Sequence, residues 1–162
     1  MSTPENPRIQ VDPRGPRFGA IITSILLATI IVVDQFAPTA ALILLAAATA
    51  LFAWGAFAGI QRHPWGAIFK RLIRPRLAPP AELEDAAAPT FAQGVGLTVT
   101  AIGLVAALLG VPHAVTVAAA IAFLAAFINA AFGLCLGCEL YAWLIRAGIV
   151  GRGNRDRQSQ RA

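Results

Sequence analysis

The feature that most constrains this chain is a set of four long apolar runs that contain no basic residue and one acidic residue, Asp34. About 20 helical residues, rising ~1.5 Å each, cross the ~30 Å hydrocarbon core of a bilayer. Apolar residues make up 57% of the chain and charged residues 13%, and almost all charges lie outside the runs, which is typical of a membrane protein rather than of a soluble core. We therefore predict an all-α membrane protein with four transmembrane helices, over residues 18–36, 40–60, 91–111 and 114–134.

Proline-marked turns divide the four predicted helices into two hairpins. Pro38 follows the first run and Pro112 follows the third, so a short turn joins the helices of each pair. A longer loop, residues 61–90, connects the hairpins. Its first part, residues 63–74, mixes aromatic, aliphatic and basic side chains, and we predict that it lies along the membrane interface.

The basic residues indicate how the chain is oriented. All 13 Lys and Arg residues precede the first run, follow the second or follow the main part of the fourth, and neither short turn contains one. The positive-inside rule then predicts that tails 1–17 and 151–162 and loop 61–90 are cytoplasmic, and that a four-helix transmembrane domain occupies residues 18–150. The net charge of +5 is interpreted as attraction to acidic lipid headgroups, not to nucleic acid.

The fourth helix is too long for a single span. Its pattern continues without proline from residue 114 to residue 150, which as one helix would be roughly 55 Å long. Either the helix projects into the cytoplasm, or it bends near Gly133 and Gly137 and continues as an amphipathic interfacial segment over residues 139–150. Aromatic and basic side chains late in this run favour the bend, namely Tyr141, Trp143 and Arg146.

The two hairpins share a pattern that suggests an internal duplication. Each begins with a Pro-x-Phe triplet, and each ends with a Gly-x3-Gly pair followed by tryptophan at the same spacing: Gly55, Gly59 and Trp65 in the first, and Gly133, Gly137 and Trp143 in the second. Duplication and chance similarity in an Ala- and Gly-rich chain both account for this pattern. Repeated hairpins occur in transporters, where the site lies between the halves, and also in proteins that transport nothing.

Small residues on the third and fourth helices predict close helix packing, because small side chains let backbones approach in lipid. Asn129 is a strongly polar side chain within the fourth predicted span. It could donate an interhelical hydrogen bond or line a path for a substrate.

Cys135 and Cys138 are the feature that most suggests chemistry. Two thiols three residues apart approach each other on a helix, so they could form a dithiol/disulfide couple, although buried cysteines are also common packing residues. In one continuous helix, the nearby Glu139 carboxylate would disfavour a thiolate. If a new helix starts after Gly137, Cys138 lies at its N-terminus, where the helix dipole favours a thiolate. On a regular helix both cysteines point away from the face of Asn129, towards lipid, another helix or a second subunit.

A metal site is an alternative role for the cysteines, but one chain supplies only two thiolates and structural zinc requires four ligands. His63 and Glu139 could complete the set if the hairpins are duplicated, or two copies of the chain could combine their cysteines. No catalytic triad, phosphate-binding loop or nucleotide fingerprint is recognisable, so the sequence implies no cofactor.

Two segments together resemble a known family. The opening segment V-D-P-R-G-P-R-F-G-A (residues 11–20) and the closing segment N-A-A-F-G-L-C-L-G-C-E-L-Y (residues 129–141) resemble the bacterial membrane family catalogued as domain of unknown function 4395. The resemblance extends over residues 11–146. It implies a four-helix inner-membrane protein of unestablished activity that keeps the cysteine pair, and it implies a soluble thioredoxin-like or rhodanese-like partner.

Two hypotheses about function follow. In the first, Cys135 and Cys138 are a catalytic redox pair, or carry a persulfide, at the cytoplasmic interface, and Glu139 and Tyr141 support them. In the second, the protein is a non-enzymatic membrane module, either a small-solute transporter or a scaffold for a cytoplasmic partner, and the cysteines are structural. Both hypotheses allow a homo-oligomer.

Overall fold

A computed structural model describes residues 9–80 and 82–149. Within these residues the fold is all-α, with four helices long and apolar enough to cross a membrane, which confirms the predicted fold class. These helices are α1 (Arg14–Asp34), α2 (Pro38–Ala58), α4 (Ala87–Leu108) and α5 (Ala114–Phe132). The predicted tail 151–162 and the first eight residues of the predicted tail 1–17 lie outside the described residues.

Short elements connect and flank the long helices. Two paired strands have no counterpart in the sequence prediction, because two residues show no periodicity: Gln10 pairs with Asp85, and Val11 with Glu84. The short elements, in chain order, are β1 (Gln10–Val11), η1 (Ile60–Arg62), α3 (Pro64–Ile68), the π-helical turn η2 (Phe69–Ile73), η3 (Arg74–Arg76), β2 (Glu84–Asp85) and α6 (Leu136–Arg146).

Helix α1 begins at Arg14, inside the segment predicted to be a solvated tail. The Arg14 guanidinium donates a hydrogen bond to the Asp12 carboxylate at 2.8 Å, which lowers the pKa of Asp12. The backbone N–H of Arg14 donates to the same carboxylate at 3.0 Å, which fixes the first turn. Pro16 is tolerated in this turn because the first N–H groups of a helix have no intrahelical partner. Helix α1 therefore begins before the apolar run from which it was predicted, although it ends at Asp34, inside that run.

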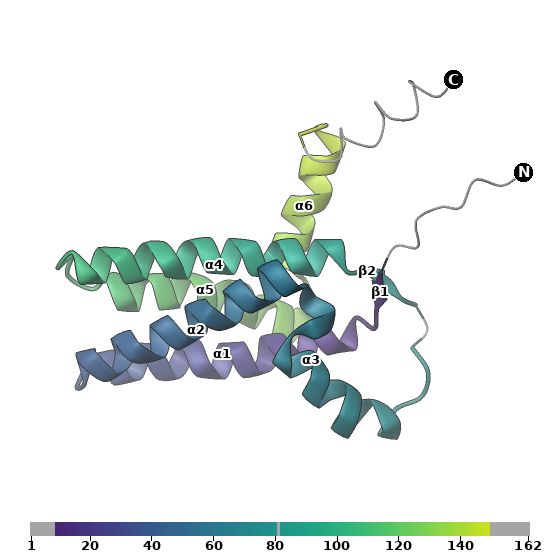
Figure 1. The fold of residues 1–162 in the computed structure, drawn as a ribbon, viewed down its shortest axis with the longest axis horizontal. Helices are drawn as coiled ribbons and strands as arrows, with labels where there is room; N and C mark the ends of the chain where they lie inside the picture. The colour runs from purple at the N-terminus through teal and green to yellow at the C-terminus, as the bar shows by residue number, and fades with distance from the viewer. Residues whose placement is uncertain (1–8, 81, 150–162) are drawn as a thin grey trace, which may run out of the picture.

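The four long helices form a bundle in which each hairpin packs against the other (Figure 1). Helix α1 packs extensively on α5, and α2 packs on α4, while α1 also contacts α2 and α4 contacts α5. The short α3 contacts α1, the first helix of its own hairpin, just as α6 contacts α4. The two hairpins thus make equivalent helix contacts, as an internal duplication would produce.

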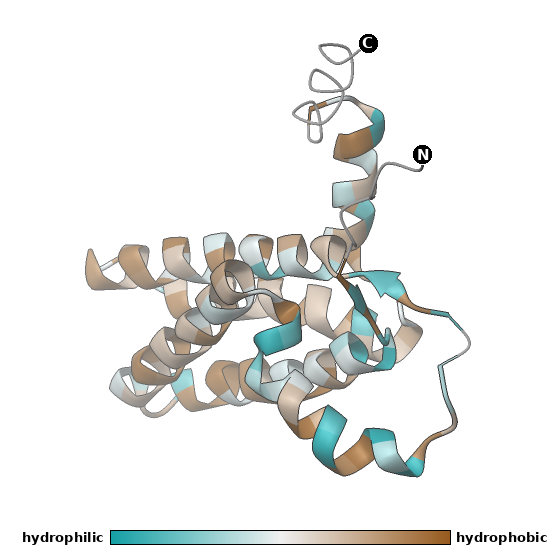
Figure 2. Ribbon diagram, turned by 45° about the vertical axis from the view of Figure 1, so that its right-hand side comes forward, coloured by the Kyte–Doolittle hydropathy of each residue, from teal (hydrophilic) through white to brown (hydrophobic). Residues whose placement is uncertain are grey.

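Small side chains allow this close packing. A Cβ atom added at Gly103 of α4 would overlap the Ala118 side chain of α5, so the two backbones approach more closely than larger residues permit. Leu27, Ile30 and Leu45 are fully buried between the helices. Large apolar side chains such as Ile25 and Phe57 remain exposed on the outer faces, as expected for contact with lipid. The hydrophilic residues gather around α3, the long loop and α6 (Figure 2).

The structure decides between the two alternatives for the fourth helix in favour of the bend. Helix α5 ends at Phe132, Gly133 adopts a left-handed conformation with φ +71°, and a new helix, α6, begins at Leu136. Glycine adopts this conformation without the cost of a Cβ clash. Helix α6 leaves the bundle at a steep angle (Figure 1). We call the end of the bundle that carries α3 and α6 the α3/α6 end, and the opposite end the turn end.

Candidate functional site

Cys135 and Cys138 form a disulfide at the start of α6, with their Cα atoms 5.1 Å apart. Cys135 is the N-cap residue of the helix, and its Sγ accepts a hydrogen bond from the backbone N–H of Cys138 at 3.3 Å. The side chains of both residues are half-buried. The bend therefore places a disulfide at a helix N-terminus, where backbone N–H groups and the helix dipole face its first sulfur.

The cysteines sit at a different position relative to the helix start than the sequence predicts for a bent helix. A helix that started after Gly137 would have placed Cys138 at its N-terminus. Helix α6 instead starts one residue before Gly137, because Cys135 has extended backbone and caps the helix with its own sulfur. The helix dipole consequently acts on the Cys135 sulfur first.

The opening segment of the chain holds the bend in place. The Arg17 guanidinium donates hydrogen bonds to the backbone carbonyls of Ala130 and Ala131, both at 3.0 Å, in the last turn of α5. Carbonyls at a helix C-terminus lack intrahelical partners, and a cation there also interacts favourably with the helix dipole. The two segments that carry the family resemblance thus meet directly. The opening segment caps the C-terminus of α5, and the closing segment continues from that cap into the disulfide.

Helix α6 is docked on α4 by a close backbone contact and an aromatic pair. A Cβ atom at Gly137 would lie 2.7 Å from the Cα atom of Ala92, so only glycine fits there without a shift. The Tyr141 ring lies 5.4 Å from the Phe91 ring. Glu139 is exposed in the first turn of α6, and its backbone N–H donates to the Cys135 carbonyl. Tyr141 therefore anchors the helix, and both predicted supporting residues lie on the same short helix as the disulfide.

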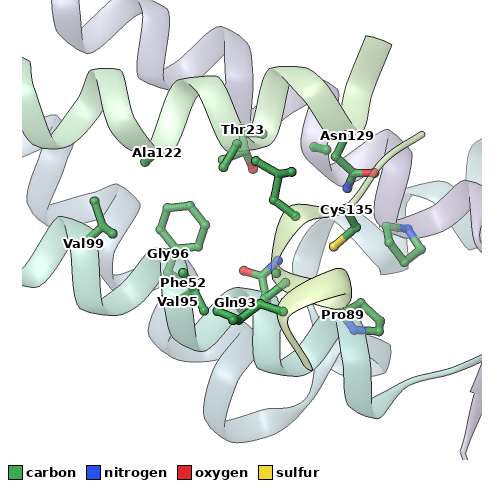
Figure 3. A pocket seen from close by; sticks show the side chains of 18 of the residues that line it. Thr23, Phe52, Pro89, Gln93, Val95, Gly96, Val99, Ala122, Asn129 and Cys135 are labelled. Atoms are coloured by element: carbon green, nitrogen blue, oxygen red, sulfur yellow. The ribbon is translucent and has the colours of Figure 1, made fainter. Parts of the chain in front are cut away.

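A cavity of about 270 Å³ lies beside Cys135 at the α3/α6 end of the bundle (Figure 3). All four long helices and α6 contribute to its lining, which is mostly apolar; Pro16, Ala20, Phe52, Gly96, Val99, Ala122 and Leu136 are among the lining residues. Asn129 and Cys135 both line this cavity. On a regular helix the cysteines would point away from the face of Asn129. The bend at Gly133 interrupts that helix and turns the chain back towards α4, so Cys135 and Asn129 come to line the same cavity.

Three polar side chains line this otherwise apolar cavity: Thr23, Gln93 and Asn129. Their hydrogen bonding is unusual. The other hydroxyls of α1, on Ser24 and Thr29, donate to the carbonyl four residues earlier in the helix. Within residues 9–80 and 82–149, by contrast, the side chains of these three residues make no hydrogen bond. Gln93 was not singled out from the sequence, and the signal that could have found it is an amide two residues inside a predicted span.

The structure does not bring His63 to the cysteines. His63 is buried, its Nε2 donates to the Leu51 carbonyl of α2 at 3.2 Å, and its Nδ1 accepts the N–H of Trp65 at 3.4 Å. Both ring nitrogens are thus engaged in docking α3. In the described part of the chain, no group of three or more His, Cys, Asp or Glu side chains is placed to hold a metal ion.

Docking of α3 is expected to weaken in acid because of His63. Burial lowers the pKa of His63 below its ordinary value of 6.5. The unfolded chain then binds the proton more tightly than the folded chain, so the His63 contribution to stability is complete above about pH 6.5 and is lost as the pH falls further. We expect the thermal midpoint of the detergent-solubilised protein to fall between pH 7.5 and pH 5. This fall in thermal midpoint should be smaller in His63→Gln. In His113→Asn, which alters an exposed turn, it should equal that of the unaltered protein. Equal falls in the two variants would contradict this assignment.

A comparison with protein-family models found one that covers most of the chain. The model described as "Domain of unknown function (DUF4395)" matches residues 11–146, from the capping segment before α1 to the last residue of α6. No curated protein and no solved structure matches the chain.

Proposed function

The chain belongs to the family of domain of unknown function 4395, and within this family we propose that it is a membrane thiol/disulfide relay that uses Cys135 and Cys138 at the cytoplasmic interface. The observation that carries the proposal is the disulfide at the N-terminus of α6. A helix N-terminus stabilises a thiolate, and the thiolate is the form that attacks and leaves in disulfide exchange.

The distribution of basic residues supports the proposed orientation of the relay. The described Lys and Arg residues, including Arg17, Arg71 and Arg146, lie at the α3/α6 end or in the loop beyond it. The turn end has no Lys or Arg in residues 35–37 and 109–113. The positive-inside rule supports a cytoplasmic α3/α6 end in a bacterial inner membrane. The disulfide would then lie where soluble cytoplasmic proteins can reach it.

The partner proposed for this relay is a soluble thioredoxin-like protein with two thiols. One partner thiolate attacks the Cys138 sulfur, forming a mixed disulfide and releasing Cys135 as a thiolate, which the N-terminus of α6 stabilises as a leaving group. The second thiolate of the partner then attacks the sulfur of the partner's first cysteine in the mixed disulfide. This step closes a disulfide within the partner and releases Cys138 as a thiolate. The partner loses two electrons, and the membrane protein gains them as a dithiol.

A rhodanese-like protein could deliver sulfur to the same pair. Transfer of its sulfane sulfur to the Cys135 thiolate would give a persulfide on Cys135. Attack by the Cys138 thiolate on the Cys135 Sγ would then close the disulfide and release the outer sulfur as hydrosulfide. Release of sulfide distinguishes this route from electron transfer alone.

Reduction of the disulfide by a thioredoxin system tests the proposal. The oxidised protein in lipid nanodiscs is mixed with thioredoxin, its reductase and NADPH, and free thiols are counted by the mass shift with a polymer-tagged maleimide. We expect both cysteines to become labelled within minutes. The Cys138→Ser protein should instead label once whether or not the reductant is present, because its remaining thiol has no partner.

The opposite result would favour the membrane module with structural cysteines. A disulfide that resists thioredoxin and becomes reducible only when detergent unfolds the protein would show that the pair only stabilises the bend between α5 and α6. Labelling of the reduced protein with a charged maleimide in right-side-out and inside-out vesicles tests the orientation, and we expect rapid labelling only from the cytoplasmic face.

A further inference from the structure

We propose that the cavity beside Cys135 binds a lipophilic quinone, which accepts the electron pair of the reduced cysteines. The inference rests on the thiol/disulfide function proposed above and adds the second substrate that such a relay requires. A dithiol that receives two electrons from a soluble partner must pass them on, and the cavity adjoins the sulfur that the helix dipole favours as a thiolate.

The size and position of the cavity suit a ligand that comes from the bilayer. Its volume of about 270 Å³ is close to the lower limit of ~300 Å³ for small-molecule sites. Along α4 it extends from Pro89 to Val99, roughly 15 Å at the rise of a helix, and so reaches well into the apolar part of the bundle. Three exposed apolar side chains belong to its lining, so that a hydrocarbon tail could leave the cavity into lipid: Ile121, Leu136 and Leu140.

The polar side chains of the cavity suit the head of such a ligand. Thr23, Gln93 and Asn129 come from three different helices, and Figure 3 shows them around the space that Cys135 faces. Hydroxyl and amide groups can donate hydrogen bonds to carbonyl oxygens, which are the polar atoms of a quinone ring. An acyl chain would leave all three groups without a partner, and in an apolar site each unpartnered polar group costs free energy. The cavity therefore fits a ring with carbonyl oxygens better than a lipid tail.

The cysteines and the quinone form a balanced two-electron reaction. The Cys135 thiolate adds to an electron-poor carbon of the quinone ring and forms a C–S bond. The Cys138 thiolate then attacks the Cys135 Sγ, which forms the disulfide and breaks the C–S bond, and the electron pair of that bond stays on the ring. The two ring oxygens take up the two protons that the thiols gave up. The dithiol thus loses two electrons and two protons, and the quinone leaves as a quinol.

Direct oxidation of the reduced protein tests the proposal. Reduced protein in phosphatidylcholine nanodiscs is mixed with a short-tailed benzoquinone, such as decylubiquinone, or with a short-tailed naphthoquinone. The quinone absorbance and the remaining thiols are then followed together. We expect one quinol for each disulfide formed. Binding is measured separately by quenching of tryptophan fluorescence in the Cys135→Ala/Cys138→Ala protein, which cannot react.

Matched threonine variants locate the site. Thr23→Val removes a hydroxyl that lines the cavity, and we expect the quinone concentration for half-maximal oxidation rate to rise about tenfold with little change in the maximal rate constant. A tenfold change corresponds to ~1.4 kcal/mol, about the worth of one hydrogen bond. Asn129→Leu should have a similar effect. Thr29→Val, in the same helix as Thr23, removes an exposed hydroxyl that is bonded to the Ile25 carbonyl and should leave both constants unchanged.

The two proposals can fail separately. If thioredoxin reduces the disulfide but quinone neither binds nor oxidises the thiols, the quinone site is refuted and the thiol relay stands. Quinone binding without thiol oxidation would refute the quinone as the electron acceptor, and equal effects of Thr23→Val and Thr29→Val would refute its placement in this cavity. If thioredoxin cannot reduce the disulfide, and chemically reduced protein does not react with quinone, both proposals fall.

Discussion

Replacing Gly137 with alanine is expected to detach α6 from α4 and to destabilise the protein by about 1–3 kcal/mol, the usual cost of an overpacked contact. The new Cβ atom would lie 2.5 Å from the Ala92 side chain and 2.7 Å from its Cα atom, and the latter belongs to the backbone of a long helix that cannot easily give way. We expect a lower thermal midpoint in detergent. In the reduced protein we also expect faster maleimide labelling of Cys135, because its cover would be lost.

Gly94 provides the matched control for this substitution. It lies in α4, two residues after Ala92, and a Cβ atom added there would meet nothing within 4 Å. Gly94→Ala should therefore be neutral, or stabilising by up to ~1 kcal/mol because alanine is the better helix former. Equal behaviour of the two alanine variants would show that α6 does not pack on α4 as described.

Replacing Arg17 with glutamine is expected to loosen the end of α5 and to destabilise the protein by about 1–2 kcal/mol. The change removes two hydrogen bonds to the carbonyls of Ala130 and Ala131 and a positive charge at a helix C-terminus. The expected destabilisation is no larger than this because the contact is exposed and solvent screens the charge. We expect the last turn of α5 to fray, which would be measured as faster hydrogen exchange at Gly133, whose N–H donates to the Asn129 carbonyl.

Two further variants separate the geometry of Arg17 from its charge. Arg17→Lys keeps the charge but lacks the planar guanidinium that reaches both carbonyls, so it should restore only part of the stability. Arg71→Gln removes an exposed arginine on η2, away from α5, and should have little effect. Full rescue by lysine, or an equal loss in Arg71→Gln, would contradict a specific capping role for Arg17.

The membrane spans could be predicted from the sequence because hydrocarbon thickness sets a length that a run of apolar residues must match. Helix starts were predicted less well. Arg14 and Ala87 begin α1 and α4 before the apolar runs at residues 18 and 91, because capping and backbone hydrogen bonds continue a helix beyond the hydrocarbon. The length of the last run and the presence of Gly133 predict the bend between α5 and α6 as one of two alternatives.

The candidate site could be predicted only in part. The spacing of Cys135 and Cys138 showed that the two sulfurs could meet, but the cavity beside them depends on how the two hairpins pack. The sequence does not reveal that Gln93 and Asn129, which lie 36 positions apart, line one cavity with Cys135. A regular helical wheel even placed Asn129 and the cysteines on different faces, because a single left-handed residue at Gly133 changes the direction of every side chain after it.

The contact between α1 and α5 has a consequence for biosynthesis. It joins the first long helix to the last, and Arg17 caps a helix end made more than 110 residues later, since its bonds to Ala130 and Ala131 span 113 and 114 positions. Helices in lipid are inserted before they associate. The ribosome has therefore delivered all four spans before the cysteine pair acquires its helix cap and its cavity, so a chain stalled during translation would present no assembled site.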